Sequence, residues 1–117
     1  MSKGPRELMN NFLNGMQELG KTNEVQVGAF MNLSSKLFEP GVLDLKTKVL
    51  ISVGIAVYNR CEYCIPFHTF KALEAGATRE EIIEAAMVSV GLGGGPSMAY
   101  IATLLKDSLD EFEGDFK

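Results

Sequence analysis

Residues 45–58 read LKTKVLISVGIAVY, and this stretch decides the fold class. Its β-branched residues would also suit a strand, but the stretch is long for one and no partner strand can be recognised elsewhere. Asp44, directly before it, is a candidate N-cap. We therefore predict a helix over Leu45–Tyr58, and because it has almost no polar face we expect it in the middle of the molecule.

Helical patterns also precede this stretch. Apolar residues at three- and four-residue spacing predict a first helix that starts at Pro5 and ends at Gly20. A second apolar pattern begins near Asn23 and ends at the turn signal Glu39-Pro40-Gly41. Strand signals do not alternate with these helices, as a parallel sheet would require.

The pattern continues after the central stretch. A fourth helix is predicted from around Cys61 to Gly76, a glycine of the kind that often ends a helix. Thr78 and Glu81 have the spacing of a capping box, which predicts the start of a fifth helix that reaches Val90.

A glycine-rich run at residues 91–96 is expected to break the helical pattern. Phosphate binding is an alternative interpretation, but no strand precedes the run and no Lys-Ser/Thr pair follows it. A sixth helix then carries apolar residues from Met98 to Phe112 on one face. The prediction is an all-α fold, a single domain of about six helices over residues 1–117.

Composition limits the classes of function. The chain has 117 residues, of which 46% are hydrophobic, enough for one domain with its own core. A net charge of -4 and a pI near 5.0 argue against a nucleic-acid surface. The longest uncharged run, Val49–Asn59, is about half of the roughly 20 residues that a membrane span requires. Because no secretory signal is recognisable at the start, we expect a cytoplasmic protein without membrane or nucleic-acid partners.

Both cysteines and the only histidine lie between Cys61 and His68. On a helix, the spacings from Cys61 to Cys64 and from Cys64 to His68 would bring all three side chains onto one face. The first turn of a helix stabilises a thiolate, and His68 can take the proton from the thiol of Cys64. Two cysteines at this spacing can also close a disulfide, so the motif supplies a nucleophile, a resolving thiol and a proton carrier, and requires no metal or organic cofactor.

Other interpretations of these residues remain open. Zinc needs more protein ligands than the three on offer, and covalent haem attachment needs a histidine where Ile65 stands. The cysteines can also be small buried residues beside a core histidine. The flanking aromatic residues Tyr58, Tyr63, Phe67 and Phe70 can line an apolar pocket, although core packing explains them equally well.

The stretch from Cys61 to His68, followed by Lys71-Ala72-Leu73-Glu74-Ala75-Gly76-Ala77-Thr78-Arg79-Glu80-Glu81-Ile82, resembles the carboxymuconolactone decarboxylase and alkylhydroperoxidase-D-like family. The resemblance is strongest from about Leu45 to Pro96. It implies an all-α fold that assembles as a homo-oligomer, commonly a homotrimer or homohexamer. It also implies that Cys64 attacks a small-molecule peroxide or disulfide, that Cys61 resolves the product, that His68 belongs to a proton relay, and that a dithiol reductant regenerates the pair.

One position departs from the family pattern. Redox-active members carry a glutamate on the preceding helix where this chain has Val49, so Glu62 or Glu39 would have to replace it at His68. Decarboxylase members lack the cysteine pair, which disfavours cofactor-free decarboxylation with His68 as acid or base. The sequence thus favours a thiol-dependent peroxidase or disulfide reductase, with an oligomeric scaffold that has lost the relay as the alternative.

Overall fold

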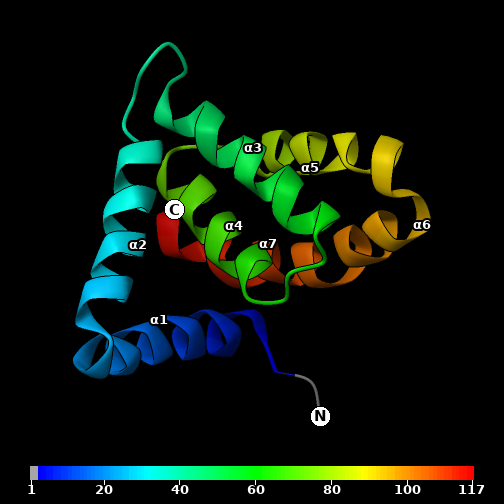
Figure 1. Ribbon diagram of the computed structural model, residues 1–117. Coiled ribbons are helices and arrows are strands. Elements are labelled where there is room, and N and C mark those ends of the chain that lie inside the picture. The colour runs from blue at the N-terminus through cyan, green and yellow to red at the C-terminus, as the bar shows by residue number, and fades with distance from the viewer. Residues whose placement is uncertain (1–2) are drawn as a thin grey trace.

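The computed structural model describes residues 3–117, and all regular secondary structure in that range is helical. Two helices at the N-terminus form an arm, and the remaining helices pack into a body beside it (Figure 1). The elements are α1 (Pro5–Thr22), α2 (Glu24–Leu37), α3 (Leu45–Tyr58), α4 (Cys64–Glu74), α5 (Arg79–Val88), α6 (Val90–Tyr100), the π-helical turn η1 (Ile101–Leu105), α7 (Lys106–Phe112) and the 3-10 turn η2 (Glu113–Phe116). The predicted all-α fold is confirmed.

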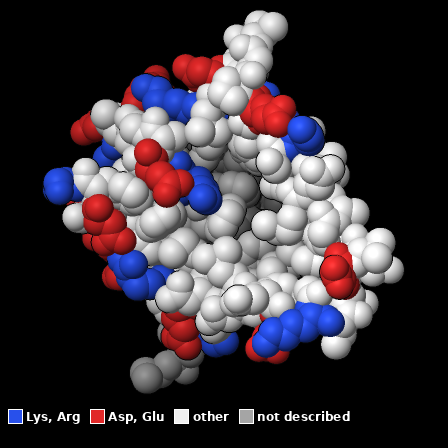
Figure 2. All heavy atoms as spheres, turned by 90° about the vertical axis from the view of Figure 1, so that its left-hand side faces the viewer, with Lys and Arg blue, Asp and Glu red and all other residues white. Residues whose placement is uncertain are grey.

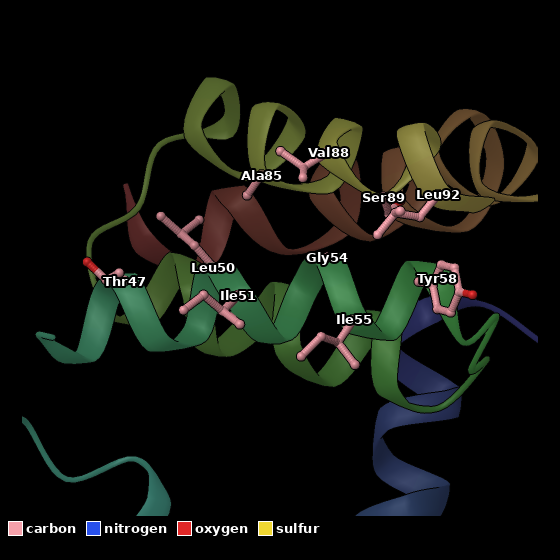
Figure 3. Close-up of a pocket in the computed structure, with 10 residues that line it drawn as sticks. All are labelled: Thr47, Leu50, Ile51, Gly54, Ile55, Tyr58, Ala85, Val88, Ser89 and Leu92. Carbon is pink, nitrogen blue, oxygen red and sulfur yellow. The ribbon is translucent and has the colours of Figure 1, made fainter. Parts of the chain in front are cut away.

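Helix α3 has the predicted bounds and the predicted cap. The Asp44 carboxylate accepts the backbone N–H of Thr47 at 2.8 Å, and hydrogen bonding to Thr47 lowers the pKa of Asp44. The helix packs between α4 and α5, and Gly54 makes the second contact close, since a Cβ there would lie 3.3 Å from the backbone oxygen of Ala85 (Figure 3). A side chain at position 54 would require the backbone of α5 at Ala85 to shift by a few tenths of an ångström.

The central position predicted for α3 holds for one side of the helix only. Val53 and Val57 are fully buried among α4, α5 and the C-terminal helices. Ile51 and Ile55, in contrast, are 48% and 55% exposed. The apolar outer side of α3 is therefore left uncovered within one chain.

The core lies between α3, α4, α5 and the C-terminal helices. Its largest fully buried side chains are Ile65, Ile82, Leu105, Leu109 and Phe112. They come from α4, α5, η1 and α7, so residues far apart in sequence share one cluster. Burying a side chain of this size contributes about 1.5–3 kcal/mol to folding, which makes this cluster the main support of the body.

The start of α5 and the end of α4 follow the predicted signals, whereas the end of α1 does not. Thr78 Oγ1 accepts the N–H of Glu81 at 3.1 Å while Glu81 Oε1 accepts the N–H of Thr78 at 2.9 Å, so the capping box is confirmed. Gly76, at φ +91°, follows the end of α4 as predicted. The predicted end of the first helix is wrong, because α1 runs through Gly20 to Thr22. Glycine disfavours a helix interior by only about 1 kcal/mol, and an ongoing apolar face outweighs that.

The glycine-rich run breaks the helical pattern as predicted, but at a single residue. Helical geometry resumes at Val90, and the break is confined to a kink at Gly94, where φ is 60° and ψ is -140°. Pro96 follows in the first turn after this kink, where proline is tolerated. The predicted sixth helix is the continuous segment formed by the second half of α6, η1 and α7.

The arm and the body are held together at a few points. Helix α2 has no buried residue, although it carries several large apolar side chains. Lys48 on α3 donates from Nζ to the backbone oxygens of Leu37 (3.0 Å) and Glu39 (2.6 Å), which fixes the end of α2.

Within residues 3–117, no helix combines the length and the apolar character that crossing a bilayer demands.

Candidate active site

The link between α3 and α4 sets the position of the cysteine pair. The N–H of Cys61 donates to the oxygen of Ala56 at 3.1 Å and that of Arg60 to the oxygen of Val57 at 3.0 Å, the two bonds of a Schellman motif. Arg60 has the left-handed conformation of this motif, with φ 54°. Because the chain turns here, α4 starts at Cys64, and the expectation that Cys61 lies on the same helix face is wrong.

Cys61 and Cys64 are joined by a disulfide, with 5.1 Å between their Cα atoms. The backbone N–H of Cys64 also donates to Sγ of Cys61 at 3.2 Å. Cys64 is the first residue of α4, and Pro66 lies in its first turn, where proline is tolerated. Both sulfurs thus sit in or beside the positive end of a helix, a place that favours a thiolate once the disulfide is reduced.

His68 lies one turn beyond Cys64 on α4, between two aromatic rings. Phe38 stacks against the imidazole at 6.2 Å between ring centroids, and Phe67 meets it edge-on at 5.2 Å. Burial lowers the pKa of His68 below its ordinary value of 6.5, because the charged form loses hydration there. The imidazole is therefore neutral at pH 7 and can accept a proton.

The structure brings no carboxylate to His68 within the described residues. Glu39 pairs with Lys36 at 3.2 Å, and Glu62 is exposed on the turn before α4. Neither hydrogen-bonds to the imidazole, so neither replaces the family's glutamate. Val49 itself is 4% exposed and belongs to the hydrophobic core.

Cys64 and His68 open into a large apolar hollow of about 740 Å³ between the arm and the body. Figure 2 shows this hollow, whose walls are uncharged, on the side of the molecule where α2 lies. No Lys, Arg, Asp or Glu is among its lining residues. Its apolar wall includes Phe12, Met16, Phe30, Met31, Leu37 and Phe38.

Sequence reasoning located the cysteines and the histidine but missed most of this wall. Tyr63 and Phe67 line the hollow as the aromatic pattern allowed, whereas Phe70 packs in a T-shaped contact on Phe112. Tyr58 lines a separate groove instead. The side chains from α1 and α2 were missed because their helical spacing is that of any amphipathic helix.

The second concavity, which we call the α3–α5 groove, has a volume of about 450 Å³ and contains no cysteine or histidine. It runs between α3 and α5, where Ile51, Ile55 and Val88 border it in Figure 3. Leu92 at its end is 83% exposed.

As for metals, residues 3–117 contain no group of three or more Cys, His, Asp or Glu side chains placed to hold an ion.

Comparison with known proteins agrees with this geometry. The model of the carboxymuconolactone decarboxylase family matches residues 27–107. A crystal structure of a carboxymuconolactone decarboxylase family protein from Legionella pneumophila superposes with a TM-score of 0.85 at 32% identity and covers 97% of each chain. An uncharacterised protein of Paracoccus denitrificans is 37% identical over 99 residues, 82% of this chain and 88% of its own.

A more distant relative carries a functional name. The alkyl hydroperoxide reductase AhpD of Mycobacteroides abscessus is 32% identical over 75 residues, which are 64% of this chain but only 41% of that protein. The family match extends over more than half of the present chain and includes both cysteines and His68. The chain therefore belongs to the carboxymuconolactone decarboxylase family.

Proposed function

We propose that this protein is a thiol-dependent peroxidase or disulfide reductase in which Cys64, Cys61 and His68 are the catalytic residues. The observation that carries the proposal is the Cys61–Cys64 disulfide next to a neutral His68, with Cys64 on the wall of an apolar hollow. The similarity to alkyl hydroperoxide reductases supports it. We assign the reaction to a reducing compartment such as the cytoplasm, where a dithiol partner is available.

The peroxidase reaction starts from the reduced pair. His68 takes the proton of the Cys64 thiol, and the thiolate attacks one oxygen of a hydroperoxide. A sulfur–oxygen bond forms as the O–O bond breaks, and the alkoxide leaves as the alcohol with the proton from His68. The sulfur of Cys61 then attacks the sulfenic acid on Cys64, the proton of the Cys61 thiol passes to the departing hydroxide, and water leaves as the disulfide closes.

The cycle closes by thiol–disulfide exchange. An external dithiol supplies two electrons and two protons, becomes a disulfide itself and returns Cys61 and Cys64 to thiols. With a disulfide substrate, Cys64 would form a mixed disulfide and release one thiol, and Cys61 would release the second. The uncharged walls of the hollow favour an organic substrate without charge over a charged one.

Stopped-flow kinetics test this function. The pre-reduced protein is mixed with cumene hydroperoxide, and consumption of one equivalent with formation of the Cys61–Cys64 disulfide is expected. Cys64→Ser should abolish the fast phase, and Cys61→Ser should stop at a sulfenic acid that a dimedone-type reagent traps. Ser34→Ala, which changes another side chain of the hollow, is the matched control. If Cys64→Ser consumes the hydroperoxide as fast as the parent, the proposed mechanism is wrong.

Val49 motivates a second candidate function, an oligomeric scaffold without redox activity. This apolar core residue stands where redox-active relatives are expected to carry a glutamate, and no carboxylate within residues 3–117 hydrogen-bonds to His68. Titration of the Cys64 thiol separates the two candidates. A pKa at or above about 8.5, together with no disulfide under mild oxidant, would favour the scaffold.

We also propose that residues 1–117 act as one domain that assembles as a homotrimer or homohexamer. The exposed apolar side chains of α2 and of the α3–α5 groove support assembly, because exposed apolar surface of this kind commonly marks an interface. Sedimentation velocity should show an oligomer that Val88→Asp weakens and that Lys21→Asp, an exposed change on α1, does not. A monomeric parent at micromolar concentration would refute the assembly.

A further inference from the structure

Ser52 lies on the same wall of the hollow as His68, and the packing of α3 on α4 explains why. Helix α4 runs back along α3 after the short link (Figure 1), and the bond from Cys61 to the oxygen of Ala56 fixes their relative positions at the closed end. Ser52 is one turn before Ala56, and His68 is one turn after Cys64. All four residues line the hollow, so Ser52 and His68 stand at the same height on adjacent helices.

The hydroxyl of Ser52 is prepared to accept a hydrogen bond. Its proton is donated to the backbone oxygen of Lys48 at 3.1 Å, within its own helix. The lone pairs of Oγ are then directed away from that carbonyl and are available to a donor. The other polar side chains of the hollow are not on α3 or α4: Gln17 and Ser34 belong to the arm, and Asn59 and Tyr63 lie in the link between α3 and α4.

His68 needs an acceptor of this kind. A neutral imidazole carries one N–H and one lone pair, and the partner of the N–H decides which nitrogen keeps the lone pair. Phe38 and Phe67 hold the ring in place but cannot make that choice, because they offer no hydrogen-bond acceptor of comparable strength. No carboxylate lines the hollow; apart from His68, its titratable side chains are Cys64 and Tyr63.

We propose that Ser52 is the positioning residue for His68, in place of the absent glutamate. Its hydroxyl accepts the N–H of His68 through one bridging water molecule and leaves the lone pair of the other ring nitrogen for the proton of Cys64. The role of Ser52 in proton transfer rests on the proposed function, whereas the hydrogen bond itself can be tested without any redox activity. Unlike a carboxylate, a hydroxyl carries no charge and so does not stabilise the imidazolium strongly, which fits a histidine that starts neutral.

Nitrogen NMR of the imidazole tests the assignment directly, because His68 is the only histidine in the chain. In ¹⁵N-labelled protein, the shifts and two-bond couplings of the two ring nitrogens report the tautomer ratio at pH 7.5. We expect one tautomer in excess in the parent, and Ser52→Ala should bring the ratio toward unity by about threefold to tenfold, the range of one net hydrogen bond. Ser52→Thr, which keeps the hydroxyl, should retain the parent ratio.

Ser34→Ala is the matched control, since it removes a hydroxyl from the arm side of the same hollow. Ser52→Ala is expected to fold, because the lost bond lies within one helix turn, and circular dichroism verifies this. An unchanged tautomer ratio in folded Ser52→Ala, or an equal change in Ser34→Ala, would overturn the assignment. If the ratio shifts as expected while the parent consumes no hydroperoxide, Ser52 still positions His68 and the proposed function fails separately.

Discussion

Arg60 adopts a conformation that glycine would adopt without strain. The Schellman motif after α3 places Arg60 at φ 54°, whereas the same motif after α4 has Gly76 at φ 91°. An L-residue in the left-handed region costs roughly 1–2 kcal/mol, and glycine offsets part of any gain through its freedom in the unfolded chain.

Arg60→Gly should therefore raise the unfolding free energy of the oxidised protein by about 0.5–1 kcal/mol, as urea denaturation would measure. Gly76→Ala is the reciprocal change, since it forces a side chain into the same conformation, and should lower stability by about 1 kcal/mol. A loss of stability in Arg60→Gly would show that the arginine side chain contributes more than its backbone costs.

His68 makes stability depend on pH in a defined direction. Burial lowers its pKa in the folded protein below the unfolded value of about 6.5, so the unfolded chain binds more protons in that interval. The unfolding free energy is then constant above that value and falls as the pH drops through 6.5 toward the folded pKa.

Urea midpoints at pH 7.5 and pH 5.5 check this expectation. The parent should lose stability between the two values, and His68→Asn should lose less, since the acidic groups contribute equally to both proteins. An identical loss in the parent and in His68→Asn would contradict a neutral, partly buried imidazole.

At the scale of the element, the start of α5 depends on two reciprocal bonds between Thr78 and Glu81. Thr78→Ala removes the hydroxyl acceptor and leaves the N–H of Glu81 without a protein partner, so we expect a loss of about 1 kcal/mol in urea denaturation. Thr103→Ala is the control, because that hydroxyl only donates to the Ala99 oxygen one turn back on an exposed surface. Equal losses in both variants would indicate a general effect of threonine removal.

The elements that could be predicted are those whose ends are set by local chemistry. Asp44 and Thr78 predicted the starts of α3 and α5, because each side chain accepts a hydrogen bond from a backbone N–H only three residues further along the chain. The start of α4 could not be located, because the turn before it requires Arg60 to adopt the left-handed backbone conformation. That conformation is uncommon for residues other than glycine, so an arginine does not predict it. The break within residues 91–96 was predicted, but its place at Gly94 could not be, because glycine permits a turn at several of these positions without requiring one.

At the scale of the whole molecule, Arg6 ties the two ends of the described chain together. Its guanidinium donates to Glu111 at 2.8 Å and to Asp115 at 3.1 Å, and it lies 5.0 Å from the centre of the Phe112 ring. Each exposed ion pair contributes at most about 1 kcal/mol, so Arg6→Gln should cost roughly 1 kcal/mol in urea, less in 1 M salt. Lys21→Gln, which breaks only a pair on one helix, should cost less than half of that.

The packing of the whole molecule separates the parts of the candidate site that the sequence predicts from the parts that it does not. Cys61, Cys64 and His68 stand out in the sequence because no other thiol or imidazole competes with them. The hollow beside them is formed by the arm on one side and by α3 and α4 on the other. The apolar pattern of a helix does not predict its distance from another helix, so the hollow could not be predicted. The contribution of Ser52 was likewise hidden, because it depends on how α3 and α4 lie against one another.

The π-helical turn at Ile101–Leu105 has a consequence for how this chain can change in length. A π-turn holds one residue more than an α-turn while the helix continues on both sides, so the helix accommodates one extra residue here. Ile101 and Leu105 are buried, but Ala102 between them faces outward. Loss of one codon here would convert the turn to ordinary helix with little disturbance beyond it, whereas loss of one codon between Cys64 and His68 would rotate His68 away from Cys64.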